Sequence, residues 1–235
     1  MIKSNKTYQA VLFDLDHTLW DYETNSRQTI HEMYSDFDLS TQLNTSFEPF
    51  HDTFQEINMD LWSRYDKGLI PREVIRKDRF ATILSRFGNS DRSLSEALSD
   101  AYVERSPKKG NLIRDAIMIL DYLKPKYPLF VVTNGFEEVQ FTKVKSAGIE
   151  SYFREIVISD RVGHKKPSRE IFDYVALQHS LQHESLLMIG DNLLTDIAGA
   201  RNAGIDCVFF NPYKNPHSDQ VTYEIQALKE LKQIL

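Results

Sequence analysis

Five short runs of apolar residues constrain the fold of this chain most strongly. Each run is continuous rather than alternating between apolar and polar residues, which is typical of parallel strands buried on both faces. The runs are residues 10–13, 129–132, 156–158, 186–189 and 207–210. They predict five strands of one parallel sheet.

Helical patterns separate the last four runs. Apolar residues at helical spacing precede the second run, and further helices are expected between the later ones. Two of these helices should end at glycine, at Gly148 and Gly204. The expected helices are marked by Ile113, Ile117, Leu120 and Leu123, by residues 139–147, by residues 171–175 and by residues 197–203. Strands alternating with helices predict an α/β fold, a doubly wound parallel sheet with a Rossmann-like core.

The segment from residue 22 to residue 105 interrupts this alternation, because it contains no strand-like run. Three helices are expected in it, each bounded by glycine, proline or polar residues. They are residues 47–67, 71–87 and 93–104. We therefore expect a helical insertion, residues 22–105, in an α/β core made of residues 1–21 and 106–235.

Composition excludes several classes of protein. Of the 235 residues, 41% are hydrophobic and 26% are charged, which is ordinary for a globular protein. A net charge of −6 without a dense Lys/Arg run argues against a nucleic-acid polymer as partner. No apolar stretch approaches the roughly 20 residues that span a bilayer, and the polar segment 1–8 lacks a signal core. With Cys207 as its single cysteine, the chain is expected to be cytoplasmic and without a membrane partner.

Two aspartates follow the first strand. Asp14 and Asp16 are two residues apart in an extended segment, so both should face one pocket. Neighbouring carboxylates repel one another unless a cation or a proton lies between them. One carboxylate can attack phosphorus while the other protonates a leaving oxygen. A turn with helix-capping aspartates is the alternative.

Polar residues also follow the second and third strands. The hydroxyl of Thr133 and the backbone around Asn134 are expected to bind the phosphate of a substrate, although an ordinary capped turn has the same residues. After the third strand, Pro167 should hold Lys166 extended, so that Lys166 neutralises the nucleophile and the phosphate. The neighbouring residues His164 and Lys165 are expected to face solvent.

Asp191 and Asp196 follow the fourth strand. Hard oxygen ligands beside a phosphate site suit Mg²⁺. Asp191 is expected to complete a metal site with Asp14. Asp196 is expected to orient that ligand or a water, or to cap the following helix.

All four groups lie at the carboxyl edge of one sheet, where α/β proteins bind ligands. In this combination the chain resembles the haloacid dehalogenase-like hydrolase superfamily. The resemblance implies that the helical insertion, residues 22–105, is a cap and that residues 1–21 and 106–235 are the catalytic core. The resemblance implies that Asp14 is the nucleophile and a metal ligand, and that Asp16 is the general acid/base and offers its backbone carbonyl to Mg²⁺. It further implies that Thr133 binds phosphate, Lys166 stabilises charge and Asp191 binds the metal.

The function implied is a magnesium-dependent phosphomonoester hydrolase that acts on a small phosphorylated metabolite through an aspartyl-phosphate. The dehalogenases of the superfamily lack the second aspartate, so Asp16 favours a phosphatase. Alternatives are a sugar-phosphate phosphatase, a phosphotransferase such as a mutase, and a non-catalytic binding protein on the same fold. The charged set Asp14, Asp16, Lys166 and Asp191 argues against the last.

A narrower resemblance is to the pyrimidine 5′-nucleotidase branch, which acts on nucleoside monophosphates. It rests on residues 61–68, 133–136 and 163–172. In the cap, Trp62 and Tyr65 are three residues apart on a helix and are expected to pack in its core. Stacking on a base is the alternative for these two residues and for Tyr22, and Arg72 or Arg76 is a further candidate for substrate contact.

Overall fold

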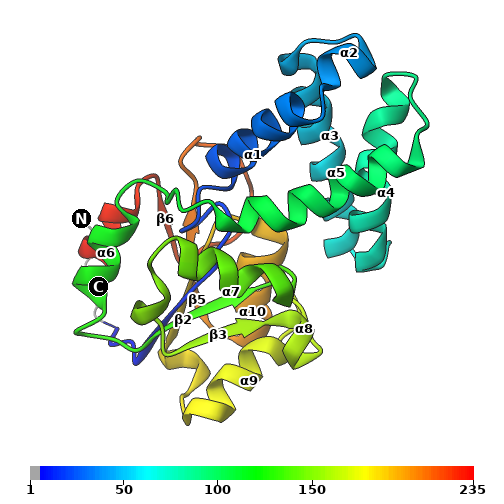
Figure 1. Ribbon diagram of the computed structural model, residues 1–235. Coiled ribbons are helices and arrows are strands. Elements are labelled where there is room, and N and C mark those ends of the chain that lie inside the picture. The colour runs from blue at the N-terminus through cyan, green and yellow to red at the C-terminus, as the bar shows by residue number, and fades with distance from the viewer. Residues whose placement is uncertain (1–5) are drawn as a thin grey trace. The chain divides into compact units, whose positions relative to one another are not determined.

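The computed structural model describes residues 6–235, which form two compact units (Figure 1). One unit contains the chain up to Tyr22 together with Gly110–Leu235, and the other is Glu23–Lys109. The polar segment 1–8, expected to carry no signal core, falls partly outside the described residues. Within residues 6–235, no helix has the length and apolar character needed to cross a membrane.

Six parallel strands form a single sheet in the first unit, in the order β3-β2-β1-β4-β5-β6. The strands are β1 (Ala10–Phe13), β2 (Leu129–Thr133), β3 (Glu155–Ile158), β4 (Leu186–Gly190), β5 (Asp206–Phe210) and β6 (Tyr223–Ile225). The predicted parallel α/β sheet is confirmed. Strand β1 lies between β2 and β4, so the carboxyl ends of these three strands are neighbours.

Helices cover both faces of the sheet, which explains why the apolar runs are continuous. Along β1, Val11 and Phe13 belong to one buried cluster, with residues of α6, whereas Ala10 and Leu12 belong to another, with residues of α9 and α10. The helices of this unit are α6 (Ala116–Leu123), α7 (Glu137–Ser146), α8 (Ser159–Val162), α9 (Glu170–His179) and α10 (Ala198–Ala203). Removing apolar surface from water on both faces is the main stabilising contribution to this unit.

Three local features differ from the expectation. The strand β6 was not predicted, because three residues with a central glutamate give no apolar run. Helix α6 begins only at Ala116, after Asp115 in a left-handed conformation, so Ile113 lies outside the helix. Ile117 lies within the helix, and 41% of it is exposed. The helix expected over 197–203 begins as a wider π-helical turn, Leu193–Ile197, that leads into α10.

The second unit consists of helices packed around aromatic side chains. The helices are α1 (Tyr22–Asp36), whose first residue belongs to the other unit, α2 (Leu39–Leu43), α3 (Phe47–Asp66), α4 (Arg72–Arg86) and α5 (Arg92–Arg105). Phe54 of α3, Phe80 of α4 and Tyr102 of α5 are buried with ring centroids 5.3–6.0 Å apart. Asp91 caps α5 by accepting bonds from the backbone of Ser93 and Leu94.

Candidate active site

The predicted site residues of the first unit gather at the carboxyl ends of the central strands. Asp14 directly follows β1, Thr133 is the last residue of β2, and Asp191 directly follows β4. Lys166 comes from the loop between α8 and α9, beyond β3. The strand order therefore brings together residues that are far apart in the sequence. Asp14 and Asp191, the most distant pair, are separated by 177 positions.

A buried lysine joins two of the aspartates. The Lys166 ammonium donates hydrogen bonds to Asp14 Oδ1 and Asp196 Oδ1, both at 2.6 Å, and to the Val132 carbonyl at 2.7 Å. Its side chain is only 1% exposed. Burial alone would lower the pKa of Lys166, but the charges of Asp14 and Asp196 outweigh it and raise that pKa, so the lysine is charged.

Asp14, Asp191 and Asp196 form an acidic cluster whose ligand atoms all lie within 4.8 Å of one another. Burial raises the pKa of Asp14 well above its ordinary value, and it raises the pKa of Asp191 to about 7, with the charge of Asp196 adding to both shifts. The hydroxyl of Thr18 donates to Asp191 Oδ1 at 3.1 Å. Three carboxylates against one ammonium leave an excess of negative charge that a cation would balance.

Both oxygens of Asp196 are already engaged. Oδ1 accepts from Lys166, and Oδ2 accepts from the backbone N–H of Asn192 at 3.1 Å. The side chain folds so tightly against the end of β4 that a Cβ at Gly190 would lie 2.2 Å from Asp196 Oδ2. Asp196 therefore holds Lys166 and the turn after β4 together.

The turn after β2 uses its polar side chains internally. Thr133 Oγ1 accepts hydrogen bonds from Gln140 Nε2 at 2.9 Å and from the Gly135 N–H at 3.0 Å. The Asn134 side chain pairs with the backbone of Lys166, donating to its carbonyl at 2.9 Å and accepting from its N–H at 2.8 Å. The side chain of Asn134 thus joins the second and third motifs, and the backbone around this residue stays the part expected to bind substrate.

The carboxylate of Asp16 is held apart from the acidic cluster, by two residues that the sequence did not single out. Lys143 donates to its Oδ1 at 2.6 Å and Gln140 donates to its Oδ2 at 2.9 Å. Burial raises the pKa of Asp16, but Lys143 and Gln140 outweigh this effect and lower it. The available signal was two long polar residues three positions apart on the helix that follows the Thr133 turn, a spacing that puts them on one face of α7.

The other residues singled out in the sequence have different surroundings. Lys165 is partly exposed and His164 exposed. In the second unit, Tyr65 is buried and makes an edge-on contact with Trp62, with ring centroids 5.6 Å apart. Arg76 lies 3.5 Å from Asp100, and Arg72 is partly exposed. In the first unit, Tyr22 contacts the rings of His17 and Trp20.

A family model described as haloacid dehalogenase-like hydrolase matches residues 11–210. The chain belongs to this family. The resemblance inferred from the motifs is thereby confirmed, and the match includes every predicted site residue.

Several relatives of this hydrolase match over almost the whole chain. The HAD-hydrolase YfnB of Bacillus subtilis is 30% identical over 98% of this chain and 96% of its own. Its crystal structure, described as bound to magnesium, superposes with a TM-score of 0.87 at 28% identity, covering 96% of this chain and 97% of YfnB. The pyrimidine 5′-nucleotidases PynA of Streptococcus pneumoniae and YjjG of Escherichia coli are 29% and 30% identical, over 95% and 96% of this chain and 93% and 96% of their own.

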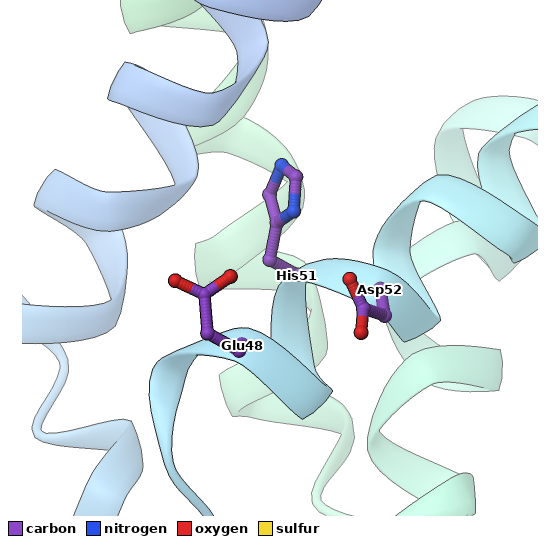
Figure 2. Close-up of side chains that lie close together, drawn as sticks. All are labelled: Glu48, His51 and Asp52. Carbon is purple, nitrogen blue, oxygen red and sulfur yellow. The ribbon is translucent and has the colours of Figure 1, made fainter.

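The helical unit of this hydrolase contains a second group of ligand-type side chains, Glu48, His51 and Asp52. Figure 2 shows them on one helix, with the imidazole between the two carboxylates. The guanidinium of Arg27 donates to Glu48 Oε1 at 2.6 Å and lies 3.1 Å from His51 Nδ1. Burial and the charge of Arg27 lower the pKa of His51. The positive charge at this cluster is already supplied by Arg27, which disfavours a metal ion there.

Proposed function

We propose that this chain is a magnesium-dependent phosphomonoester hydrolase that acts on small phosphorylated metabolites through an aspartyl-phosphate at Asp14. The observation that carries the proposal is the contact of the buried Lys166 with Asp14, beside Asp191 and with Asp16 two residues further on. The Lys166 ammonium partly neutralises the negative charge of the attacking carboxylate and provides a positive charge next to the incoming phosphate.

In the first step a carboxylate oxygen of Asp14 attacks phosphorus, and the bond from phosphorus to the leaving oxygen breaks. Asp16, in its protonated form, gives its proton to that oxygen, so the product leaves as an alcohol. The electron pair of the broken bond stays on the leaving oxygen. The chain then carries a phosphoryl group on Asp14 and a carboxylate at Asp16.

In the second step Asp16 takes a proton from a water molecule as the water oxygen attacks phosphorus. The bond between phosphorus and Asp14 breaks, and its electron pair returns to the Asp14 carboxylate. Inorganic phosphate leaves, and Asp16 is again protonated. One residue thus serves as acid in the first step and as base in the second.

Thr133 is suited to hold a phosphate oxygen during both steps. Its Oγ1 accepts hydrogen bonds from Gln140 and Gly135, and these use both lone pairs of the hydroxyl. The hydroxyl hydrogen remains to donate to an anionic oxygen. The surrounding bonds also fix the direction in which it points.

Asp14 and Asp191, with the backbone carbonyl of Asp16, are the groups proposed to hold Mg²⁺. The donor set consists of oxygens, which Mg²⁺ prefers, and it carries an excess of negative charge that Lys166 partly balances. The related YfnB, whose crystal structure is described as bound to magnesium, supports this choice. When bound, the ion would screen the charge of Asp14 and polarise phosphoryl oxygens.

Pyrimidine nucleoside monophosphates are the proposed preferred substrates. Support comes from PynA and YjjG, two relatives that match nearly the whole chain and are named pyrimidine 5′-nucleotidases. The test compares kcat/KM for uridine and thymidine monophosphates with kcat/KM for sugar phosphates at one pH and one Mg²⁺ concentration. A general advantage for sugar phosphates would overturn the nucleotidase proposal and leave the phosphatase mechanism standing.

The mechanism itself is tested with purified protein and p-nitrophenyl phosphate. Phosphate release should require Mg²⁺, stop on chelation and return on adding the metal. Acid quenching during turnover should give a phosphorylated chain, located at Asp14 by mass spectrometry. Turnover by Asp14→Asn at a rate near that of the wild type would refute covalent catalysis at this residue.

A further inference from the structure

We propose that Lys143 and Gln140 of helix α7 are positioning residues that orient the Asp16 carboxylate for proton transfer to and from the reacting oxygen. The inference rests on the role proposed above for Asp16. Neither residue belongs to the four motifs that identify the family. Both lie on the helix that begins just after the phosphate-binding turn (Figure 1).

The two contacts fix the orientation of the carboxylate plane. Lys143 Nζ lies 2.6 Å from Asp16 Oδ1, and Gln140 Nε2 lies 2.9 Å from Asp16 Oδ2. Each oxygen is bound by a different side chain, so rotation of the carboxylate would break both contacts. A carboxylate oxygen that accepts one hydrogen bond keeps a second lone pair, so Asp16 can still carry a proton while it is held.

The position of Lys143 is itself fixed by the loop that carries Asp16. Its side chain is 9% exposed, and its ammonium lies 4.5 Å from the ring centroid of the fully buried Trp20. Trp20 is tied to this loop because its carbonyl accepts a hydrogen bond from the His17 N–H at 3.0 Å. Desolvation and the ring face both strengthen a contact that would contribute little on the surface.

Gln140 connects the acid to the phosphate-binding residue. Its amide nitrogen donates both to Asp16 Oδ2 and to Thr133 Oγ1, at 2.9 Å each. The amide orientation is determined, because the carboxylate form of Asp16, which serves as the base in the second step, can only accept hydrogen bonds. A Cβ at Gly135 would lie 1.5 Å from this nitrogen, which explains the glycine in the turn.

The amide oxygen of Gln140 indicates that the bonds from its amide nitrogen do more than stabilise the fold. Gln140 is fully buried, and among residues 6–235 its Oε1 has no hydrogen-bond partner. Leaving a buried acceptor unpaired destabilises the folded state. The side chain is thus held where it reaches Asp16 and Thr133 at a cost in stability, as expected where geometry at a reacting group matters.

The test compares two classes of substrate at saturating Mg²⁺. An alkyl phosphate needs a proton on its leaving oxygen, whereas an aryl phosphate with an acidic phenol needs little help. Lys143→Met should lower kcat for the alkyl phosphate by about 10–100-fold and change kcat for the aryl phosphate much less. Lys143→Arg should restore most of the alkyl activity. Lys145→Met, on the exposed face of the same helix, is the matched control and should leave both activities unchanged.

A double-mutant cycle separates positioning from a general structural role. In the Asp16→Asn background, Lys143→Met should cause no further loss, because the proton donor is already gone. Gln140→Met should show the same selectivity for alkyl phosphates and the same lack of additivity. Thermal unfolding of every variant shows whether it is folded. If Lys143→Met does not fold, Gln140→Met, which removes the other contact to Asp16, carries the test.

The outcomes distinguish the two proposals. Equal losses of kcat for alkyl and aryl phosphates, or full additivity of Lys143→Met with Asp16→Asn, would overturn the positioning role. The phosphatase proposal would still stand if the wild type is active with Mg²⁺. A wild type without Mg²⁺-dependent hydrolysis of either ester would overturn both.

Discussion

The side chain of Asn134 and the backbone of Lys166 are joined by a pair of hydrogen bonds, at 2.9 Å and 2.8 Å. The pair links the turn after β2 to the loop after β3 and fixes the backbone from which the Lys166 side chain extends. That side chain then reaches Asp14, directly after the central strand β1. The position of the ammonium next to Asp14, the proposed nucleophile, therefore depends on the pairing of the Asn134 side chain with the backbone of Lys166.

Replacing Asn134 with alanine should reduce both stability and turnover. Two buried backbone groups of Lys166 lose their partners, which should lower the free energy of unfolding by about 1–3 kcal/mol. Turnover should fall because the ammonium is less firmly placed. Denaturant unfolding and kcat with p-nitrophenyl phosphate measure the two effects.

A control for this variant lies on α10. The exposed Asn202 donates one hydrogen bond, at 3.0 Å, to the carbonyl of Pro167, next to Lys166. Asn202→Ala removes a bond to the same loop without touching the Asn134 pair, and its effect on kcat should be small. If Asn202→Ala reduced kcat as much as Asn134→Ala, the specific function of the Asn134 pair would be wrong.

Replacing Lys166 with methionine should be far more damaging than the same change at Lys165. The substitution leaves Asp14 and Asp196 buried without their ammonium, which should lower the free energy of unfolding by about 3–5 kcal/mol. Turnover should fall by about 10²–10³-fold, the loss typical for a group that stabilises transition-state charge. Lys165 is partly exposed, so Lys165→Met should change stability by about 0.5 kcal/mol or less. The reverse ranking in kcat would assign the charge-stabilising role to Lys165.

The sequence predicted the sheet and the meeting of Asp14, Lys166 and Asp191 for a simple physical reason. Parallel strands buried on both faces are continuous apolar runs, and their carboxyl ends must share one edge. The residue that follows such a run is therefore placed by the strand before it. The strand β6 escaped prediction because its three residues include an exposed glutamate.

The supporting contacts of the site could not be predicted in this way. Lys143 and Asp16 are 127 residues apart in sequence. The spacing of Gln140 and Lys143 puts them on one face of α7, but it does not show whether this face or that of the exposed Lys145 lies toward Asp16. Which of the two lysines turns inward depends on how the helix lies on the sheet. The pairing of Asn134 with the Lys166 backbone likewise depends on the relative position of two loops, which apolar periodicity does not encode.

Asp14→Asn should abolish turnover and at the same time stabilise the metal-free protein. The amide is a poor nucleophile, so turnover should stop. Desolvation by burial, together with the charges of two neighbouring carboxylates, disfavours the charged form of Asp14. Removing that charge should raise the free energy of unfolding in chelator by about 0.5–2 kcal/mol, the size of gain typical at sites where function and stability conflict. Thermal unfolding in chelator measures the gain, and a clear loss of stability would show that the ion pair with Lys166 outweighs the repulsion.

The metal-free protein should lose stability as the pH rises from about 4 to about 7, and Mg²⁺ should restore it. Burial raises the pKa of Asp191 from its ordinary 3.8 to about 7 in the folded chain. Between these values the folded state keeps a proton on Asp191 that the unfolded state has released, so the contribution of Asp191 to the free energy of unfolding falls with pH and levels off above about 7. Mg²⁺ binds the ionised cluster, and its stabilising effect should therefore be larger at pH 8 than at pH 5. Thermal unfolding in chelator and in Mg²⁺ across this range measures both effects.

Other groups also contribute to the pH dependence of stability, so this prediction is tested by difference. The amide introduced by Asp191→Asn cannot ionise. This variant should therefore show a smaller fall in the free energy of unfolding between pH 4 and pH 7, and a smaller stabilisation by Mg²⁺ at pH 8. The exposed Asp78 on α4 is the matched control, since Asp78→Asn removes one carboxylate far from β4 in the sequence and should leave both curves as in the wild type. If Asp191→Asn retained the wild-type pH dependence and the full response to Mg²⁺, the negative charge that destabilises the metal-free site would have to lie elsewhere than on Asp191.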